Sequence, residues 1–362
     1  MKKITIAGAG PSGLCAAISL ARAGLQVQVQ EKEKNAGTRW VGSFQCLENT
    51  SCDEDFLEML ERIGIKKDFY CKPLYGVEVI DGKGASHPFS SARPLWYLIR
   101  RGNEKGMLDY SLKKQAIKTG VKLKFGTQAK DANILATGPS FAEGIAREMV
   151  FETNAKDQFL LLLDNTIAPK GYAYLLIADK TATLCVAIMK DFSGINKYFE
   201  LARSKLAQIS PFNVKNPKYK TNFVSFHIPS SAKRDSSLYV GEAAGFQDFV
   251  FGFGLRYAFL SGYLAAKSII DGSDYDSLWK KEFASRLELG ILNRALYEFG
   301  GDSAFANLIS QAEKEKDFGK FLHSLSKPTL AKGFLTPFAK HLLGRNNSCN
   351  HAANCAWRPK KR

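Results

Sequence analysis

The pattern of apolar and polar residues at the start of the chain predicts a strand, a helix and a second strand. Residues 4–7 form a short apolar run rich in β-branched side chains, which is typical of a buried strand. Apolar residues recur at helical spacing over residues 14–21, and Gly24 ends that pattern. Residues 26–31 alternate glutamine with valine and end at Glu31. This order predicts a βαβ unit of a parallel sheet.

The turn between the first strand and the helix reads Gly-Ala-Gly-Pro-Ser-Gly at residues 8–13. Its first glycine permits the tight turn, its second lets backbone amides approach a pyrophosphate, and its third lets helix and strand pack closely. The helix N-terminus then presents partial positive charge to the phosphates. A carboxylate at Glu31 can bind both ribose hydroxyls and disfavours a 2′-phosphate, so the cofactor here is not NADP. We expect contacts to a dinucleotide from Gly8, Gly10, Pro11, Ser12, Gly13, Glu31 and Lys32.

Later in the chain, periodic patterns predict further strands and few helices up to about residue 270. Residues 75–80 and 85–89, joined by an Asp-Gly turn, indicate a hairpin. Residues 197–209 have a helical pattern, and the chain beyond residue 271 is mostly helical. Strands are predicted at 159–164, 171–177, 182–189 and 222–228.

A second glycine-rich segment decides which dinucleotide is bound. Residues 237–240 indicate a strand that runs into Gly-Glu-Ala-Ala-Gly at 241–245, and Gly-Phe-Gly at 252–254 precedes an amphipathic helix over 255–266. This segment resembles the flavin-contacting segment of the para-hydroxybenzoate hydroxylase superfamily, and most closely that of the geranylgeranyl reductase family. Two other segments fit the same family: residues 98–120, with Arg100, Leu108 and Asp109 before a helix, and residues 133–139, with Ala-Thr-Gly after a strand.

The resemblance implies FAD as the cofactor. Glu242 would bind its ribityl chain, and the turn at 252–254 would aim a helix N-terminus at the N1/C2 oxygen of the flavin, where it stabilises negative charge. Arg39 and Arg100 are cofactor contacts by position, with a surface or core-rim role as the alternative. The further contacts implied are Ala136, Thr137, Gly138, Gly241, Glu242, Gly252, Phe253, Gly254 and Leu255.

The resemblance also implies an α/β fold with a sequence-discontinuous, Rossmann-like FAD-binding domain. An antiparallel-sheet substrate domain (α+β) and a helical C-terminal region with a basic tail would complete it. The expected FAD-binding parts are 1–70, 96–140 and 236–270, the substrate domain is 71–95 and 141–235, and the C-terminal region is 271–362.

Aromatic residues suggest a hydrophobic substrate. Tyr172 and Tyr174 stand where the reductases carry a strand that lines the substrate cavity, although tyrosine here replaces the family's tryptophan. Phe249 and Phe251 replace residues that are polar or proline in the family. This indicates that the substrate cavity has an apolar wall that excludes water and suits a lipid. The same side chains could instead be plain core.

Three functions remain open at this point, and no catalytic acid or base is apparent. The first is an FAD-dependent reductase that delivers hydride from flavin N5 to a carbon–carbon double bond of an isoprenoid or similar substrate, with NAD(P)H or ferredoxin as electron donor. The second is an aromatic monooxygenase or halogenase-like enzyme. Thr137 stands before Gly138 where monooxygenases usually carry aspartate, and the halogenase Trp-x-Trp-x-Ile-Pro signature is absent from the sequence. The third is a flavin-binding protein that has lost catalysis.

The composition is that of an ordinary globular protein, except for a high positive net charge. The 362 residues are 45% hydrophobic and 24% charged, with a net charge of +16. That charge suits anionic membranes or phosphates, or serves solubility alone; no nucleic-acid motif accompanies it, so no nucleic acid is expected. With no apolar run long enough to span a bilayer and no apolar leader, we expect a cytoplasmic protein, with peripheral membrane contact through residues 333–343 as an option. The seven cysteines are expected to be free thiols.

The C-terminal tail contains Cys349, His351 and Cys355. Thiolate and imidazole groups are zinc or iron ligands, but this spacing lacks two paired knuckles. We therefore expect a loose basic tail and no metal site.

Overall fold

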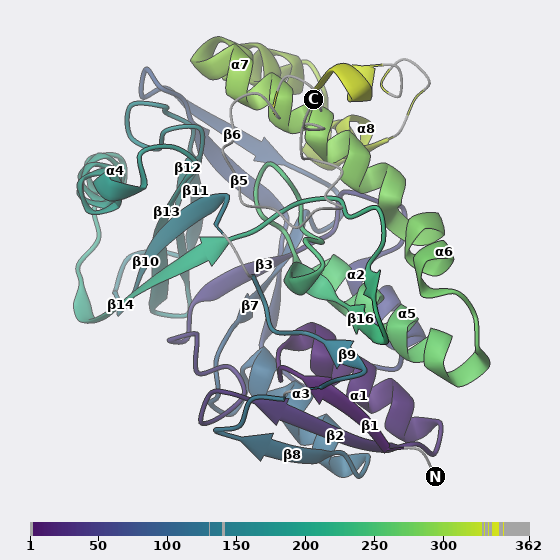
Figure 1. Ribbon diagram of the computed structural model, residues 1–362. Coiled ribbons are helices and arrows are strands. Elements are labelled where there is room, and N and C mark those ends of the chain that lie inside the picture. Colours follow the sequence, from purple (N-terminus) through teal and green to yellow (C-terminus); the bar gives the residue numbers. More distant parts are fainter. Residues whose placement is uncertain are drawn as a thin grey trace.

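The structure is a computed structural model that describes residues 3–129, 131–139, 142–327, 329, 332, 335–339 and 343. Figure 1 shows a sheet with its helices near the N-terminus, a larger sheet above it, and long C-terminal helices along one side. The first sheet is β15-β16-β9-β1-β2-β8 in spatial order. Its strands are β1 (Lys3–Ala7), β2 (Gln26–Glu31), β8 (Lys122–Phe125), β9 (Ile134–Leu135), β15 (Lys233–Arg234) and β16 (Ser237–Tyr239).

This first sheet is parallel at its centre, as the βαβ pattern predicts. β1 pairs in parallel with β2 on one side and β9 on the other, and Ile4 and Ile6 on β1 are buried. The chain leaves β1 through helix α1 (Pro11–Arg22), which packs between α3 (Leu108–Lys118) and α5 (Leu255–Asp271). Parallel strands need such a crossover helix, and α1 supplies it with an almost wholly buried apolar surface.

The second sheet has seven strands, in the order β14-β10-β13-β12-β11-β5-β6. β11 pairs in parallel with β5, and the other recorded pairs are antiparallel. Alternate residues of β10, β12 and β13 pack under helix α4 (Ile195–Ile209), which covers one face of the sheet (Figure 1). Its strands are β5 (Gly76–Ile80), β6 (Ser86–Ser90), β10 (Gly144–Glu152), β11 (Gln158–Leu162), β12 (Tyr172–Ala178), β13 (Thr181–Ile188) and β14 (Lys215–Val224).

A small antiparallel sheet packs on the face of the large sheet opposite α4. Its order is β3-β7-β4, with strands β3 (Phe44–Glu48), β7 (Trp96–Arg100) and β4 (Cys71–Leu74). The backbone N–H of Phe44 donates a 2.8 Å hydrogen bond to the Thr183 hydroxyl of β13, and Phe44 shares a buried cluster with Leu176 of β12. These contacts tie the small sheet to the large one.

The C-terminal region is helical. It begins with the short helix α6 (Tyr275–Trp279), and a π-helical turn (Lys280–Ala284) leads from α6 into α7. The other short helix, α2 (Phe56–Arg62), lies much earlier in the chain, between β3 and β4. α7 (Ser285–Glu313), bent at Gly301, and α8 (Phe318–Ser326) cover β5 and β6. Short 3₁₀ turns lie at Phe192–Gly194 and Gly241–Ala243. In the described part of the chain, no helix is both long and apolar enough to span a bilayer.

The predicted α/β fold class is confirmed, and one predicted strand has different bounds. The strand expected at 222–228 is β14, which begins at Lys215 and ends at Val224. β14 is a mostly exposed edge strand, so pairing with β10 defines it more than any apolar alternation does. β10 itself, which begins at Gly144, lies where no strand was predicted. The domain boundaries stay predictions.

Candidate functional site

The glycine turn after β1 combines close packing with open space. A Cβ on Gly8, whose φ is +104°, would lie 2.2 Å from the carbonyl oxygen of Ala136. A Cβ on Gly13 would lie 2.1 Å from the carbonyl oxygen of Gly8, so helix and strand meet at van der Waals distance. A Cβ on Gly10 would meet no atom within 4 Å. The protein therefore needs glycine at 8 and 13 for its own packing, whereas Gly10 borders open space, on the side where a pyrophosphate is expected.

Glu31 lies at the end of β2, beside this turn. One carboxylate oxygen accepts a hydrogen bond from Ala9 N–H at 2.7 Å, and the other accepts one from Glu33 N–H at 3.0 Å. These bonds hold the carboxylate at the edge of the turn, where the adenosine ribose of a dinucleotide is expected. Lys32 is solvent-exposed.

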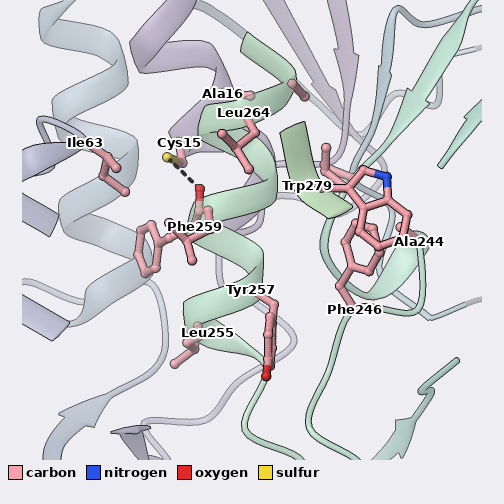
Figure 2. Close-up of a cluster of buried hydrophobic side chains, with 14 of the residues drawn as sticks. Cys15, Ala16, Ile63, Ala244, Phe246, Leu255, Tyr257, Phe259, Leu264 and Trp279 are labelled. Carbon is pink, nitrogen blue, oxygen red and sulfur yellow. Dashed lines mark hydrogen bonds between the residues drawn. The ribbon is translucent and has the colours of Figure 1, made fainter. Parts of the chain in front are cut away.

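Helix α5 is locked against the first turn of α1. The Ser261 hydroxyl accepts the N–H of Gly241 at 2.9 Å, and a Cβ on Gly262 would lie 2.2 Å from the carbonyl oxygen of Ser12. Figure 2 shows the buried surface of α5, with Phe259 and Leu264 toward Cys15 and Tyr257 on the side of Phe246 and Trp279. The glycine turn after β1 and the second glycine-rich segment, far apart in sequence, thus form one packed unit.

A cavity of about 480 Å³ joins this unit to the large sheet. Its walls come from the α1 and α5 N-termini, the cavity face of the large sheet, the small sheet, and helices α7 and α8. Of the predicted cofactor contacts, it is lined by Ser12, Arg39, Ala136, Gly138, Glu242, Gly252, Phe253, Gly254 and Leu255.

Arg39 connects the predicted ribityl site to the large sheet. Its guanidinium lies 3.7 Å from the Glu242 carboxylate, donates to the Asn222 side-chain oxygen at 3.0 Å, and donates to the Phe223 carbonyl at 3.1 Å. Burial raises the pKa of the Glu242 carboxyl, and the positive charge of Arg39 opposes that shift. Glu242 is thus held at the cavity wall, and the positive charge of Arg39 offsets only part of the cost of burying its carboxylate.

A second arginine, Arg101, is fully engaged inside the protein. It donates two hydrogen bonds to Asp109, at 2.8 and 2.9 Å, and one to the Gln45 side chain at 2.8 Å. The Trp40 ring contacts both guanidinium groups, with Arg101 4.7 Å and Arg39 5.2 Å from its centroid. Of the two arginines expected to contact the cofactor, Arg39 lines the cavity, whereas Arg100 donates to Gly42 O at 3.4 Å and does not line it.

Glu148 on β10 is a buried carboxylate in the cavity wall, only 4% exposed. Its Oε1 accepts a hydrogen bond from the Ser43 hydroxyl at 2.7 Å and a longer one from Asn222 at 3.5 Å. Burial raises the pKa of this carboxyl. Glu148 was not among the residues expected at the site; the available signal was a lone acidic residue inside the mostly apolar stretch 144–151.

The loop before α5 forms the aromatic part of the wall. The Asp248 carboxylate accepts the N–H groups of Phe251, at 2.6 Å, and Val250, at 3.1 Å, and burial raises its pKa to about 6. The Tyr172 hydroxyl donates to the carbonyl of Phe251, and the two rings pack edge to face with centroids 5.3 Å apart. Tyr172, Tyr174, Phe251 and Phe253 all line the cavity.

Phe249 does not line the cavity, contrary to the expectation. Its side chain is fully buried, packs on Phe226 at 5.0 Å between ring centroids, and lies against Gly290 of α7. The loop turns at Asp248, so side chains two residues apart point to different sides. Thr137 is exposed and also lies outside the cavity lining, whereas its neighbours Ala136 and Gly138 belong to it.

No group of three or more metal-ligating side chains is present among the described residues. Cys349, His351 and Cys355 lie outside those residues. Burial raises the pKa of Cys15 and of Cys46 to about 12, so both thiols stay protonated at neutral pH.

Sequence comparison assigns part of the chain. Residues 6–43 match a family model described as an NAD(P)-binding Rossmann-like domain, which spans the β1–α1–β2 unit and the following loop. A comparison with curated proteins finds no match to the sequence.

Structural comparison covers nearly the whole chain. A geranylgeranyl bacteriochlorophyll reductase-like protein from Thermoplasma acidophilum superposes with a TM-score of 0.69 at 15% identity, over 90% of this chain and 96% of that one. The flavin-dependent brominase Bmp2 gives 0.67 at 16% identity, over 96% and 100%. A flavoprotein/dehydrogenase from Cytophaga hutchinsonii gives 0.61 at 18% identity, over 94% and 96%. The chain thus has the fold of FAD-dependent oxidoreductases, and the resemblance seen in the sequence is confirmed at the level of fold.

Proposed function

We propose that the protein is an FAD-dependent oxidoreductase that acts on a hydrophobic substrate. One observation carries the proposal: a single cavity joins the predicted flavin-binding residues Ser12, Glu242 and Gly254 to an apolar wall on the large sheet. A cofactor held at one end of a cavity and a substrate at the other can react only if the two share that space. Most of the remaining wall is aliphatic or aromatic, as a hydrophobic substrate requires.

The residues present fit FAD. The open space at Gly10 would take the pyrophosphate, Glu31 beside the turn would bind the ribose, and Glu242 with its partner Arg39 would contact the ribityl chain. The bound flavin would supply hydride chemistry at its N5. Helix α5 begins at Leu255 in the cavity wall, so the partial positive charge of its N-terminal amides would stabilise the negative charge of a reduced flavin bound beside it. The aromatic side chains around Tyr172 exclude water from the same space.

The reaction we favour is reduction of a carbon–carbon double bond in an isoprenoid or similar molecule. The runner-up is an aromatic monooxygenase or halogenase-like reaction, because flavin-dependent halogenases, with TM-scores of 0.67 and 0.60, and a monooxygenase, with 0.59, share this fold with the reductase-like protein, which gives 0.69. A flavin-binding protein without catalysis is the third candidate. The electron donor, NAD(P)H or a ferredoxin, is proposed without a structural basis for choosing between them.

The test begins with the purified protein, which should be yellow and release FAD, and not FMN, on denaturation. Its flavin is then reduced anaerobically and mixed with polyprenyl lipids; reoxidation by the lipid supports the reductase. Reduction by NAD(P)H that becomes fast only with an aromatic substrate present, followed by oxygen uptake, supports the monooxygenase. Tyr174→Ala should keep the FAD content and lower turnover. A colourless protein that takes up no FAD would exclude all three functions.

We also propose that the protein contacts membranes peripherally. Leu335 and Phe338 are 53% and 62% exposed, and the chain carries a net charge of +16. Exposed apolar side chains on a strongly basic protein suit the surface of an anionic bilayer, from which a lipid substrate could be drawn.

A further inference from the structure

The side chains on the cavity face of the large sheet change from polar at β10 to apolar at β5. Directly paired residues lie on the same face, and one row of pairs runs from Glu148 through Cys185, Tyr174 and Leu161 to Val79. All five side chains line the cavity. The row therefore begins at a carboxylate, passes a small thiol and a tyrosine, and ends in two aliphatic side chains.

The polar end of this row has an unused hydrogen-bonding position. Both hydrogen bonds to the Glu148 carboxylate, from Ser43 and Asn222, reach Oε1, and Oε2 accepts none from the described residues. A buried carboxylate oxygen gains most from a donor that replaces the lost water. Three cations lie near Glu148. Arg101 is held by Asp109 and Gln45, and Arg39 by Glu242, Asn222 and the Phe223 carbonyl. Lys220 of β14 pairs directly with Glu148, but it does not line the cavity, so the cavity side of the carboxylate keeps its free position.

The apolar end continues beyond the sheet. Past Val79, the cavity runs between the β5–β6 hairpin and the C-terminal helices, where its walls are Leu308 and Ile309 of α7 and Phe321 and Leu325 of α8. Leu296 of α7 also lines the cavity and is 61% exposed, so the cavity reaches the surface beside it. The four apolar side chains of the arm offer a ligand dispersion and exclusion of water, which suits a hydrocarbon chain.

We infer that the cavity binds an amphipathic ligand in one orientation, with an uncharged or cationic hydrogen-bond donor, such as a hydroxyl or amine, on Glu148 and a hydrocarbon tail in the arm under α7 and α8. An anionic head is disfavoured because it would meet the Glu148 carboxylate with both arginines already engaged. This inference rests on the proposed function for the identity of the cavity as a substrate site. It adds that the head of the ligand, and not the end of its tail, lies beside the residues expected to bind flavin: Asn222 contacts both Glu148 and Arg39.

Simple alkyl probes test the orientation. Binding of 1-decanol, decyl methyl ether, decanoate and 1-hexanol is measured by calorimetry and by the fluorescence of Trp40 and Trp96, which both line the cavity. We expect 1-decanol to bind about 10- to 100-fold more tightly than its methyl ether, which lacks the donor, and decanoate to bind worst. Glu148→Met should abolish the difference between alcohol and ether. Glu152→Gln, on the same strand but exposed, should leave it unchanged.

A second variant tests the arm. Ile309→Trp should fill it and weaken 1-decanol at least about tenfold while leaving 1-hexanol nearly unaffected. Equal affinity of wild-type protein for alcohol and ether would overturn the inference, and so would equal weakening of both chain lengths by Ile309→Trp. The wild-type comparison needs no variant to fold. If the protein takes up no FAD yet binds the probes in this order, the proposed function fails and the binding inference stands.

Discussion

Gly13 on α1 packs so closely on Gly8 that a methyl group at position 13 would lie 2.1 Å from the Gly8 carbonyl oxygen. Gly10, between them in the same turn, has no neighbour within 4 Å of where its Cβ would be. Two glycines of one motif are thus required by the fold, and the third is left for a ligand. This difference separates the effect of a substitution on folding from its effect on cofactor binding.

We expect Gly10→Val to lose FAD while the apoprotein keeps its thermal midpoint, because the new side chain enters space that only the pyrophosphate would fill. Gly13→Ala should instead lower the free energy of unfolding by about 1–3 kcal/mol, because its methyl group overlaps a backbone carbonyl. Flavin absorbance after gel filtration and thermal melts of the apoproteins measure both effects. Normal flavin content in Gly10→Val would show that the phosphate lies elsewhere.

The stability of the protein should depend on the titration of Asp248. Its carboxyl has a pKa of about 6 in the folded protein, above its ordinary value of 3.8. The protonated form is therefore favoured by folding, and this stabilisation is complete below about pH 3.8 and is lost as the pH rises through about 6. Asp248→Asn, which cannot ionise and keeps an acceptor for Val250 and Phe251, should be more stable than wild type at pH 7.5 by up to about 3 kcal/mol.

Chemical denaturation of both proteins between pH 4 and pH 8 measures this difference. It should be small at pH 4 and grow through pH 6, and Glu152→Gln, an exposed carboxyl, should show no such growth. A difference between wild type and Asp248→Asn that is constant over the whole range would contradict a raised pKa at Asp248.

Membrane contact should depend on the exposed apolar residues near the C-terminus. Replacing both Leu335 and Phe338 by serine should weaken binding to vesicles of anionic phospholipid at least about tenfold, because each apolar side chain contributes about 1.5–3 kcal/mol when buried. Ile117→Ser on α3, where the isoleucine is 57% exposed, is the matched control and should bind as wild type does. Cosedimentation at low and high salt measures the affinity. If the double variant binds like wild type and salt alone releases the protein, only its charge attracts it to the membrane.

The sequence by itself determined the features that depend on neighbouring residues. The turn from Gly8 to Gly13, the strand ending at Glu31 and the hairpin of β5 and β6 are local, because their geometry follows from glycine positions and from a period of two or 3.6 residues. The resemblance of residues 237–266 to a flavin-contacting segment likewise depends only on residues that are neighbours in the sequence.

Only the tertiary structure decided which side chains share the cavity. Glu148 and Ser43 are 105 residues apart, and they meet because the small sheet, whose strand β3 follows Ser43, packs on the face of the large sheet on which Glu148 of β10 lies. Phe251 and Phe249 are two residues apart, yet one lines the cavity and the other is in the core, because the Asp248 carboxylate bends the loop between them. A strand pattern tells which residues alternate, but pairing register and loop path decide which face of which sheet they reach, and these are set by contacts between distant segments.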